Sequence, residues 1–282
     1  MNTKIINHPV WGKALFADNG IIEIGIPLEF GIRIGHLSYK NEENLFYEQP
    51  NDLNELCTPE GFRVRGGHRL WVAPESEKEY FPDNAPIKYE ISGERITLFQ
   101  EEDPYISVKK SIEITFTGDE EITLKQKVLN TKEEKRKFSV WGVTSVAPCG
   151  KALIPLRYRD NGYDPLHKIT MWDYTSLGDE RVKYERELIT LSHKPLVQKY
   201  KIGVGHPKGP VTYENKGVIF EKSYAINQSL EYPDGGVSFE IFMCRHMVEI
   251  ESLSPLFEVK SGEMAEFCEK WRLKKQGSVK LK

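Results

Sequence analysis

The chain has 282 residues, of which 39% are hydrophobic and 29% are charged, so it is long enough to bury a large core. Its formal net charge of −3 and its pI of about 6.2 argue against a nucleic-acid-binding surface. The N-terminus carries no signal-peptide pattern, and no apolar run approaches the roughly 18 residues that cross a bilayer. We therefore expect a cytoplasmic protein that binds neither nucleic acid nor membrane.

The cysteines are widely spaced and form no C-x-x-C motif. They are Cys57, Cys149, Cys244 and Cys268. This spacing predicts buried free thiols, with neither a disulfide framework nor a metal site.

Apolar residues recur with period two along most of the chain, which predicts strands. The one stretch with helical character, Glu42–Leu56, contains Pro50 and is predicted to be a loop with a short turn. Ile106–Phe116 and Ile122–Val128 are predicted to pair as a hairpin through the turn 117–120, although Lys110 interrupts the apolar face of the first strand. Further strands are predicted at Phe138–Ala147, Gln198–Val204, Gly217–Lys222, Val237–Arg245 and Ala265–Leu273.

Turn-forming residues separate these strands at intervals of roughly 8 to 12 residues. This spacing favours an all-β fold, a large antiparallel sandwich or barrel, over an alternating α/β fold. In the last strand Glu269 shares the side of Phe267 and Trp271, so the apolar alternation there is imperfect. We expect a single domain over residues 1–274, followed by a basic tail over residues 275–282.

Two acids interrupt an apolar strand near the C-terminus. In the segment Met247–Pro255, Glu249 and Glu251 are two residues apart and so share one face. A carboxylate that points into an enclosed site loses hydration, acquires a raised pKa and can serve as a general base. The alternative is that these acids lie at a strand end in water or pair with an arginine.

A second informative segment runs from Arg63 to Glu75. Two adjacent glycines allow a sharp bend, and Arg65, His68, Arg69 and Trp71 surround it. Aromatic rings stack on the apolar faces of sugars, while guanidinium groups donate paired hydrogen bonds to sugar hydroxyls. The alternative is a Gly-Gly hairpin that leads into an edge strand with solvated side chains.

The motif R-G-G-H-R-L-W in this segment resembles the R-G-G-x-x-x-x-W stretch of hexose-6-phosphate mutarotases. The sequence I-E-S-L-S-P, with the later S-G-E-M-A-E-F-C-E-K-W-R-L, is similar to the closing strands of aldose 1-epimerases. Residues Trp141–Gly150 and Met171–Arg181 look like a bacterial branch of galactose mutarotase-like proteins. The resemblance implies a β-supersandwich with a concave sugar-binding face.

The resemblance also implies residue roles. Glu251 matches the catalytic base of the family better than Glu249 does. The family's central histidine protonates the ring oxygen, but the corresponding strand here has Trp141 and no histidine. His68 or His206 is therefore the expected acid, because an imidazole titrates near neutral pH.

The remaining candidate residues would hold the sugar. Arg69 and Lys201 are expected to donate hydrogen bonds to its oxygens, and Glu249 is also expected to bind it. Arg65 with Arg69 is a candidate pair for a sugar phosphate. The expected stacking platform is one or two of the tryptophans Trp71, Trp141 and Trp172.

Three functions remain open from the sequence. The first is a mutarotase-type isomerase that interconverts sugar anomers without a cofactor, and the second is a carbohydrate-binding protein of the same fold that has lost the acid. The third is an accessory domain of a glycoside-processing system. Glu249 and Glu251, roughly 6 to 7 Å apart along one strand, do not flank a substrate as glycosidase carboxylates do. The sequence does not specify the sugar, its phosphorylation or the oligomeric state.

Overall fold

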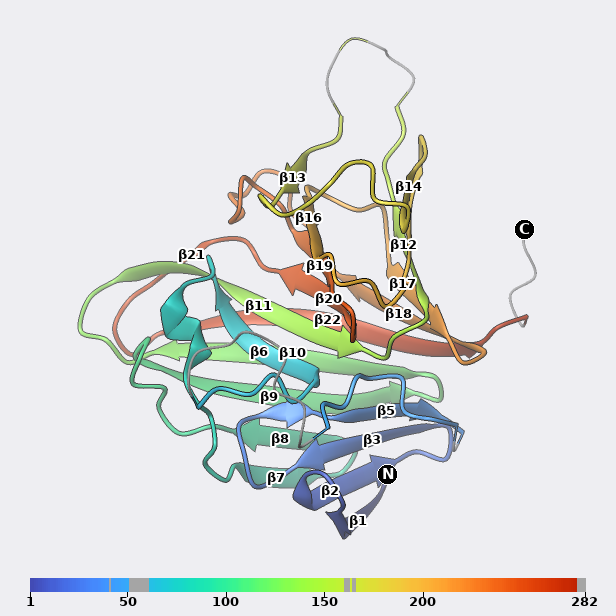
Figure 1. Cartoon of the computed structure of the whole chain (residues 1–282). Coiled ribbons are helices and arrows are strands. Elements are labelled where there is room, and N and C mark those ends of the chain that lie inside the picture. Colours follow the sequence, from blue (N-terminus) through green and yellow to red (C-terminus); the bar gives the residue numbers. More distant parts are fainter. Residues whose placement is uncertain (41, 51–60, 160–162, 164–165, 278–282) are drawn as a thin grey trace.

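The computed structural model describes residues 1–40, 42–50, 61–159, 163 and 166–277. These residues form three antiparallel sheets and one turn of 3-10 helix, η1 (Glu77–Tyr80) (Figure 1). The predicted all-β fold, a large antiparallel sandwich, is confirmed. Within this part of the chain, no helix has the length and apolar character that a membrane crossing requires.

The first sheet contains the N-terminus and has four strands in the order β1-β2-β3-β5 (Figure 1). Its strands are β1 (Asn2–His8), β2 (Gly12–Asp18), β3 (Ile22–Pro27) and β5 (His36–Tyr39). Trp11, Phe16 and Phe30 form a small apolar cluster beside it.

The largest sheet follows the order β14-β15-β12-β17-β18-β22-β10-β9-β8-β7. Its strands are β14 (Val182–Tyr184), β15 (Leu188–Ser192), β12 (Lys151–Pro155), β17 (Val211–Asn215), β18 (Val218–Tyr224), β22 (Met264–Lys275), β10 (Glu121–Asn130), β9 (Val108–Gly118), β8 (Arg95–Phe99) and β7 (Lys88–Ser92). Burial alternates along β9, β10 and β22, as expected of strands with one face on a core and one face in water.

The third sheet follows the order β13-β16-β19-β20-β11-β6-β4, and β21 pairs with β11. Its strands are β13 (Ile169–Met171), β16 (Tyr200–Val204), β19 (Phe239–Met243), β20 (Val248–Leu253), β11 (Arg136–Val146), β6 (Gly67–Ala73), β4 (Arg33–Ile34) and β21 (Phe257–Val259). Every residue of β6 and β20 is buried, so these strands are covered on both faces.

The two faces of the third sheet have different partners. Leu70 and Val72 of β6 pack into the main core against the largest sheet, whereas Trp71 and Ala73 join a separate apolar cluster on the other face. The same division holds on β20, where Ile250 belongs to the main core. Because strand side chains alternate, odd-numbered residues of β6, β11, β16 and β20 point away from that core.

The predicted strands match the observed ones with small differences at their ends. The hairpin of β9 and β10 forms with a register irregularity between Glu121 and Ile122. Lys110, which interrupts the apolar face of β9, is buried and lies 3.3 Å from Asp103. Gly67 begins β6, a strand between β4 and β11, so the edge-strand alternative is wrong.

Glycines are required where the Gly-Gly bend meets the neighbouring backbone. Gly66 and Gly67 have φ values of 84° and 69°. A Cβ atom would lie 1.9 Å from the carbonyl oxygen of Tyr47 at the first glycine and 2.3 Å from that of Ile34 at the second. The absence of side chains at both glycines therefore allows the start of β6 to lie against the backbone of these neighbouring segments.

Some predictions at the ends and surfaces need correction or fall outside the described residues. Cys244 is buried, but Cys149 and Cys268 are exposed. Cys268 is exposed because it lies on the outward face of β22, and Cys57 is outside the described residues. Lys275, predicted to begin the tail, still belongs to β22, and residues 278–282 are outside the described part. Residues 45–47 of the predicted loop run beside β11, while 51–60 are not described.

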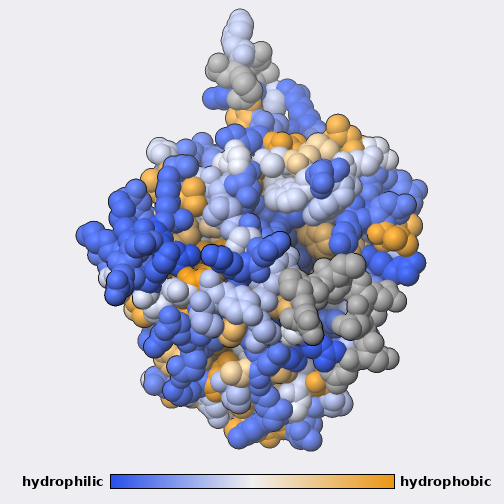
Figure 2. All heavy atoms as spheres, turned by 60° about the vertical axis from the view of Figure 1, so that its left-hand side comes forward, coloured by the Kyte–Doolittle hydropathy of each residue, from blue (hydrophilic) through white to orange (hydrophobic). Residues whose placement is uncertain are grey.

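The surface in Figure 2 is mostly hydrophilic, with hydrophobic residues in scattered patches.

Candidate functional site

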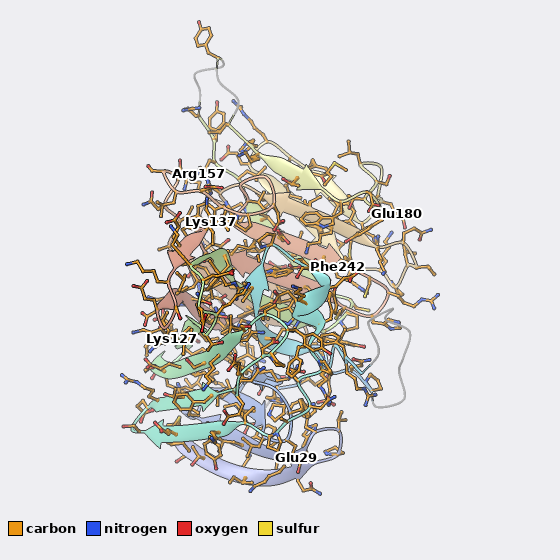
Figure 3. All side chains as sticks on the ribbon, turned by 90° about the vertical axis from the view of Figure 1, so that its left-hand side faces the viewer. Glu29, Lys127, Lys137, Arg157, Glu180 and Phe242 are labelled. Atoms are coloured by element: carbon orange, nitrogen blue, oxygen red, sulfur yellow. The ribbon has the colours of Figure 1, made fainter. Side chains whose placement is uncertain are left out.

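A cavity of about 290 Å³ opens on the face of the third sheet that is turned away from the main core. This volume lies near the lower end of the range for small-molecule sites, about 300 to 1,000 Å³. It is lined by Phe62, Val64, Arg69, Trp71, Glu75, Tyr80, Trp141, Trp172, Tyr174, Lys199, Lys201, Phe242, Met247, Glu249 and Glu251. Phe242, labelled in Figure 3, lies beside the cyan ribbon that includes β6 and η1. The lining therefore joins strands from across the sheet to the segment that follows β6.

Glu251 is the most deeply buried acid of the lining, with 1% of its surface exposed. Its Oε2 atom accepts hydrogen bonds from the indole nitrogen of Trp141 at 3.0 Å and from Lys201 Nζ at 3.1 Å. Its Oε1 atom accepts none from any described residue. Burial raises the pKa of Glu251 to about 7, although Lys201 opposes this shift. One oxygen is thus held in place, and the other is a buried acceptor without a hydrogen-bond partner among the described residues.

Lys201 connects several acids at the base of the cavity. Its Nζ lies 2.8 Å from Glu240, 3.1 Å from Glu251 and 4.0 Å from Glu75. Burial alone would lower the pKa of Lys201, but the charges of Glu251 and Glu240 outweigh burial and raise it. The lysine is therefore a charged hydrogen-bond donor at neutral pH.

Arg69 and Glu249 form the second buried ion pair of the lining. Arg69 Nη1 donates to Glu249 Oε1 at 2.9 Å, and Ser145 donates to the same oxygen at 2.8 Å. The guanidinium lies 4.3 Å from the ring centre of Trp71. Its Nε atom is buried and has no hydrogen-bond partner among the described residues. The alternative in which Glu249 pairs with an arginine is therefore the one observed, inside the cavity.

Aromatic rings form much of the cavity wall. Trp71 and Trp141 pack edge to face with ring centres 5.4 Å apart, and Tyr80 packs against Trp71 at 5.2 Å. The Lys201 ammonium lies 4.9 Å from the ring centre of Trp141 and 4.7 Å from that of Trp172. These rings offer apolar faces next to the charged groups, an arrangement that suits a ligand with both C–H faces and hydroxyls.

His68 lies on the opposite face of β6 from this cavity. It is fully buried in the main core, with its ring nitrogens 2.9 Å from the Thr144 hydroxyl and 3.1 Å from the Gln126 side-chain oxygen. Burial lowers the pKa of His68 to about 3. Because neighbours on a strand point to opposite faces, His68 and Arg69 do not line the same cavity. The structure gives no support to His68 as the acid.

His206 and Arg65 also lie outside the cavity lining. His206 lines a more open hollow of about 670 Å³ with Lys168 and Tyr232, and its ring packs edge to face on that tyrosine at 5.3 Å. Arg65 stacks on Phe30, 3.8 Å from the ring centre. The expected Arg65 and Arg69 pair for a phosphate is therefore not brought together.

Several lining residues were not singled out from the sequence. Phe62 and Glu75 lie in the loops on either side of β6 and Tyr80 ends η1, and nothing in their local sequence pattern marks them. Glu240, beneath the lining, does carry a signal, because it is an acid between Phe239 and Ile241 in an apolar strand. That is the same signal that drew attention to β20.

Among the residues that the structure describes, no group of three or more His, Cys, Asp or Glu side chains could hold a metal ion. The cavity's acids instead face lysine and arginine.

Comparisons with known proteins give matches in structure only. No protein-family model matches the sequence, and no curated protein matches it. A galactose mutarotase-like protein from Lactobacillus casei superposes with a TM-score of 0.59 at 12% identity, over 93% of this chain and 100% of that one. One from Clostridium acetobutylicum gives 0.56 at 12% identity, over 97% and 99%.

A TPR-domain-containing protein from Parabacteroides distasonis also superposes, with a TM-score of 0.63 at 14% identity. The match covers 96% of this chain and 49% of that one, so the fold here corresponds to about half of the larger protein. At these identities the matches establish the arrangement of strands. The chain has the galactose mutarotase-like fold.

Proposed function

We propose that the protein binds an unphosphorylated aldose in this cavity and interconverts its anomers by general acid and base catalysis. The observation that carries the proposal is Glu251, a buried carboxylate in a small aromatic-walled cavity with one oxygen free of hydrogen bonds from described residues. A pKa of about 7 allows Glu251 to take up and release a proton near neutral pH. The mutarotase-like names of the structural matches support the same class of ligand.

The reaction needs a base that accepts the proton of the anomeric hydroxyl and an acid that protonates the ring oxygen. Glu251 would take the hydroxyl proton while Lys201 gives a proton to the ring oxygen, so that the ring opens to the aldehyde. Rotation about the C1–C2 bond and reclosure with the roles reversed give the other anomer. Lys201 takes the place expected for a histidine, because it lines the cavity beside Glu251 and no histidine does among the described residues.

Charge in the cavity favours a neutral ligand. Arg69 is paired with Glu249, and Lys201 with Glu251 and Glu240. A phosphate bound at Arg69 or Lys201 would have to displace these carboxylates from buried cations, which leaves the carboxylates unpaired at a cost of several kcal/mol. The hydroxyls of a neutral sugar require no such displacement.

A carbohydrate-binding protein without catalysis is the second candidate. It is favoured by the ion pair of Lys201 with Glu251, because the ammonium already engages one oxygen of that carboxylate. In this case the cavity would bind sugar through stacking and hydrogen bonds and transfer no proton.

Polarimetry on freshly dissolved α-aldoses tests the proposal. The wild-type protein should accelerate the approach to anomeric equilibrium for at least one free aldose and not for hexose 6-phosphates. Glu251→Gln should lower the rate by at least about 100-fold, the usual contribution of a general base. Glu258→Gln is the matched control, because this exposed glutamate on β21 pairs with a single lysine, Lys135, at 2.8 Å.

Tryptophan fluorescence in the same samples separates the two candidates. Sugar-dependent quenching without any acceleration would establish the binding protein and end the catalytic proposal. The absence of both signals across the panel would contradict both candidates.

A further inference from the structure

Glu240 lies just beneath the cavity and is not part of its lining. It is directly opposite Glu251 in the pairing of β19 with β20. The Lys201 ammonium lies near both acids, 2.8 Å from Glu240 Oε2 and 3.1 Å from Glu251 Oε2. The exposed side-chain fractions are 1% for each glutamate and 6% for the lysine. Glu240 can therefore act on a ligand only through Lys201.

The charges of this buried group do not balance when both acids are ionised. One ammonium would then face two carboxylates, and two further acids add negative charge nearby, Glu75 of the cavity lining and Asp234 in the loop before β19. An excess negative charge in a desolvated site is unfavourable by several kcal/mol. A proton shared by the two acids removes the excess, as in other buried carboxyl pairs.

The hydrogen bonds decide which acid keeps that proton. Glu251 accepts from the Trp141 indole and from Lys201, and both donors stabilise its ionised form. Glu240 has only the Lys201 contact, and neither of its oxygens accepts a well-directed hydrogen bond from a described residue. Burial accordingly raises the pKa of Glu240 well above its usual value, while that of Glu251 rises to about 7.

We propose that Glu240 stores the proton for the acid side of the reaction and that Lys201 passes it to the sugar. This inference rests on the proposed function. As the C1–O5 bond breaks, the Lys201 ammonium gives a proton to O5, and the Glu240 carboxylic acid returns one to the lysine amine. Glu251 takes the proton of the anomeric hydroxyl as the C1 carbonyl forms. Ring closure reverses each transfer, so no proton is gained or lost. Glu240 is a positioning residue that supplies the acid missing from the cavity.

Infrared difference spectroscopy locates the stored proton without any substrate. In protein labelled with ¹³C-glutamate, the wild type should show a protonated carboxyl band at pH 7.5 that Glu240→Gln removes and Glu258→Gln keeps. Glu79, a separate buried acid whose pKa burial raises to about 7, is identified by Glu79→Gln. If Glu240→Gln does not fold, a pH titration of the carboxyl bands in the labelled wild type still shows how many buried glutamates are protonated at pH 7.5. The proposal is overturned if no buried glutamate apart from Glu79 and Glu251 holds a proton at that pH.

The pH profile of mutarotation tests the relay. Wild-type activity should rise through about pH 7 as Glu251 ionises and fall at higher pH as Glu240 loses its proton. Glu240→Gln should lower the maximal activity by about 10- to 100-fold and abolish the fall in activity at alkaline pH. Glu240→Asp should recover part of the activity and part of the alkaline fall. A profile of Glu240→Gln with the wild-type alkaline limb would overturn the relay.

The two experiments distinguish the failure of this inference from the failure of the proposed function. A wild-type protein that accelerates no sugar contradicts the proposed function and the relay, and the infrared band then decides whether Glu240 holds the proton. An active wild type without the band contradicts the inference alone.

Discussion

Trp141 occupies the strand position where a histidine was expected, and its side chain acts on Glu251 directly. The indole N–H donates to Glu251 Oε2 at 3.0 Å, while the ring packs edge to face on Trp71. A hydrogen bond to a carboxylate stabilises the charged form and lowers the pKa. The tryptophan therefore offsets part of the rise that burial causes.

Replacement of Trp141 by phenylalanine should move the rising limb of the pH profile to higher pH. Loss of a hydrogen bond to a charged group, worth about 1.5 to 3 kcal/mol, raises the pKa of Glu251 by roughly 1 to 2 units. The pH dependence of kcat/KM, or a ¹³C titration of the glutamate, measures the shift. Trp172→Phe is the control, because Trp172 contacts Lys201 and has no hydrogen bond to Glu251 among the described contacts. An equal shift in both variants would refute this role of the indole.

At the scale of elements, a buried lysine of the largest sheet contacts the strands of the third sheet that hold the site. Lys222 of β18 donates to the carbonyl oxygens of Gly142 on β11 and Ile250 on β20 at 2.9 and 3.1 Å. It also lies 3.4 Å from Glu269 of β22, which accepts from Gln126 of β10. The backbone next to Glu251 is thus fixed from across the sandwich.

Lys222→Met should destabilise the fold by about 3 to 5 kcal/mol, since it leaves the Glu269 carboxylate buried without its cation. Urea unfolding measures the loss. The double variant with Glu269→Leu should recover a substantial part, because an apolar pair leaves no unpaired charge. Lys274→Met, which removes a partly exposed pair with Glu221 on the same two strands, should cost under about 1 kcal/mol. Equal losses in the two single variants would contradict the importance of burial.

For the whole molecule, buried titratable groups make the free energy of unfolding depend on pH in two opposing ways. The folded pKa of His68 is about 3 against 6.5 when exposed, so the unfolded chain binds the extra proton and stability falls as pH falls from 6.5 toward 3. Glu251 and Glu79 rise to about 7 from 4.5, so the folded chain retains their protons and stability falls as pH rises from 4.5 to 7. Between about pH 4.5 and pH 6.5 these groups oppose one another, because the histidine favours a higher pH and the two carboxyls favour a lower pH.

His68→Gln should flatten the acid side of this curve. One histidine contributes about 1.4 kcal/mol per pH unit between about pH 6 and pH 4, and the variant should lose that slope whatever its stability at neutral pH. Urea unfolding at several pH values gives the slope, with the exposed His167→Gln as control. An unchanged slope would show that His68 titrates normally in the folded protein.

The sequence supplied more of the fold than of the site. Period-two patterns identified the strands β9, β10, β11, β16, β18, β19 and β22, and the acids within an apolar run drew attention to β20. The strands of the first sheet and the short outer strands of the other two sheets were not predicted. The same alternation, applied to β6, would have placed His68 on the face opposite Arg69. The sequence could not supply the loop residue Glu75 or the distance from Lys201 to Glu251, because those contacts join segments far apart in the chain.

The sequence alone determined that the chain forms antiparallel strands and that Glu249 and Glu251 share a face, because both follow from local alternation of side chains. Only the tertiary structure decided that Lys201 and Glu240 lie against Glu251, and that Arg65, His68 and His206 lie outside the cavity. Strand order and sheet packing set those distances, and strand order depends on pairings between residues remote in sequence.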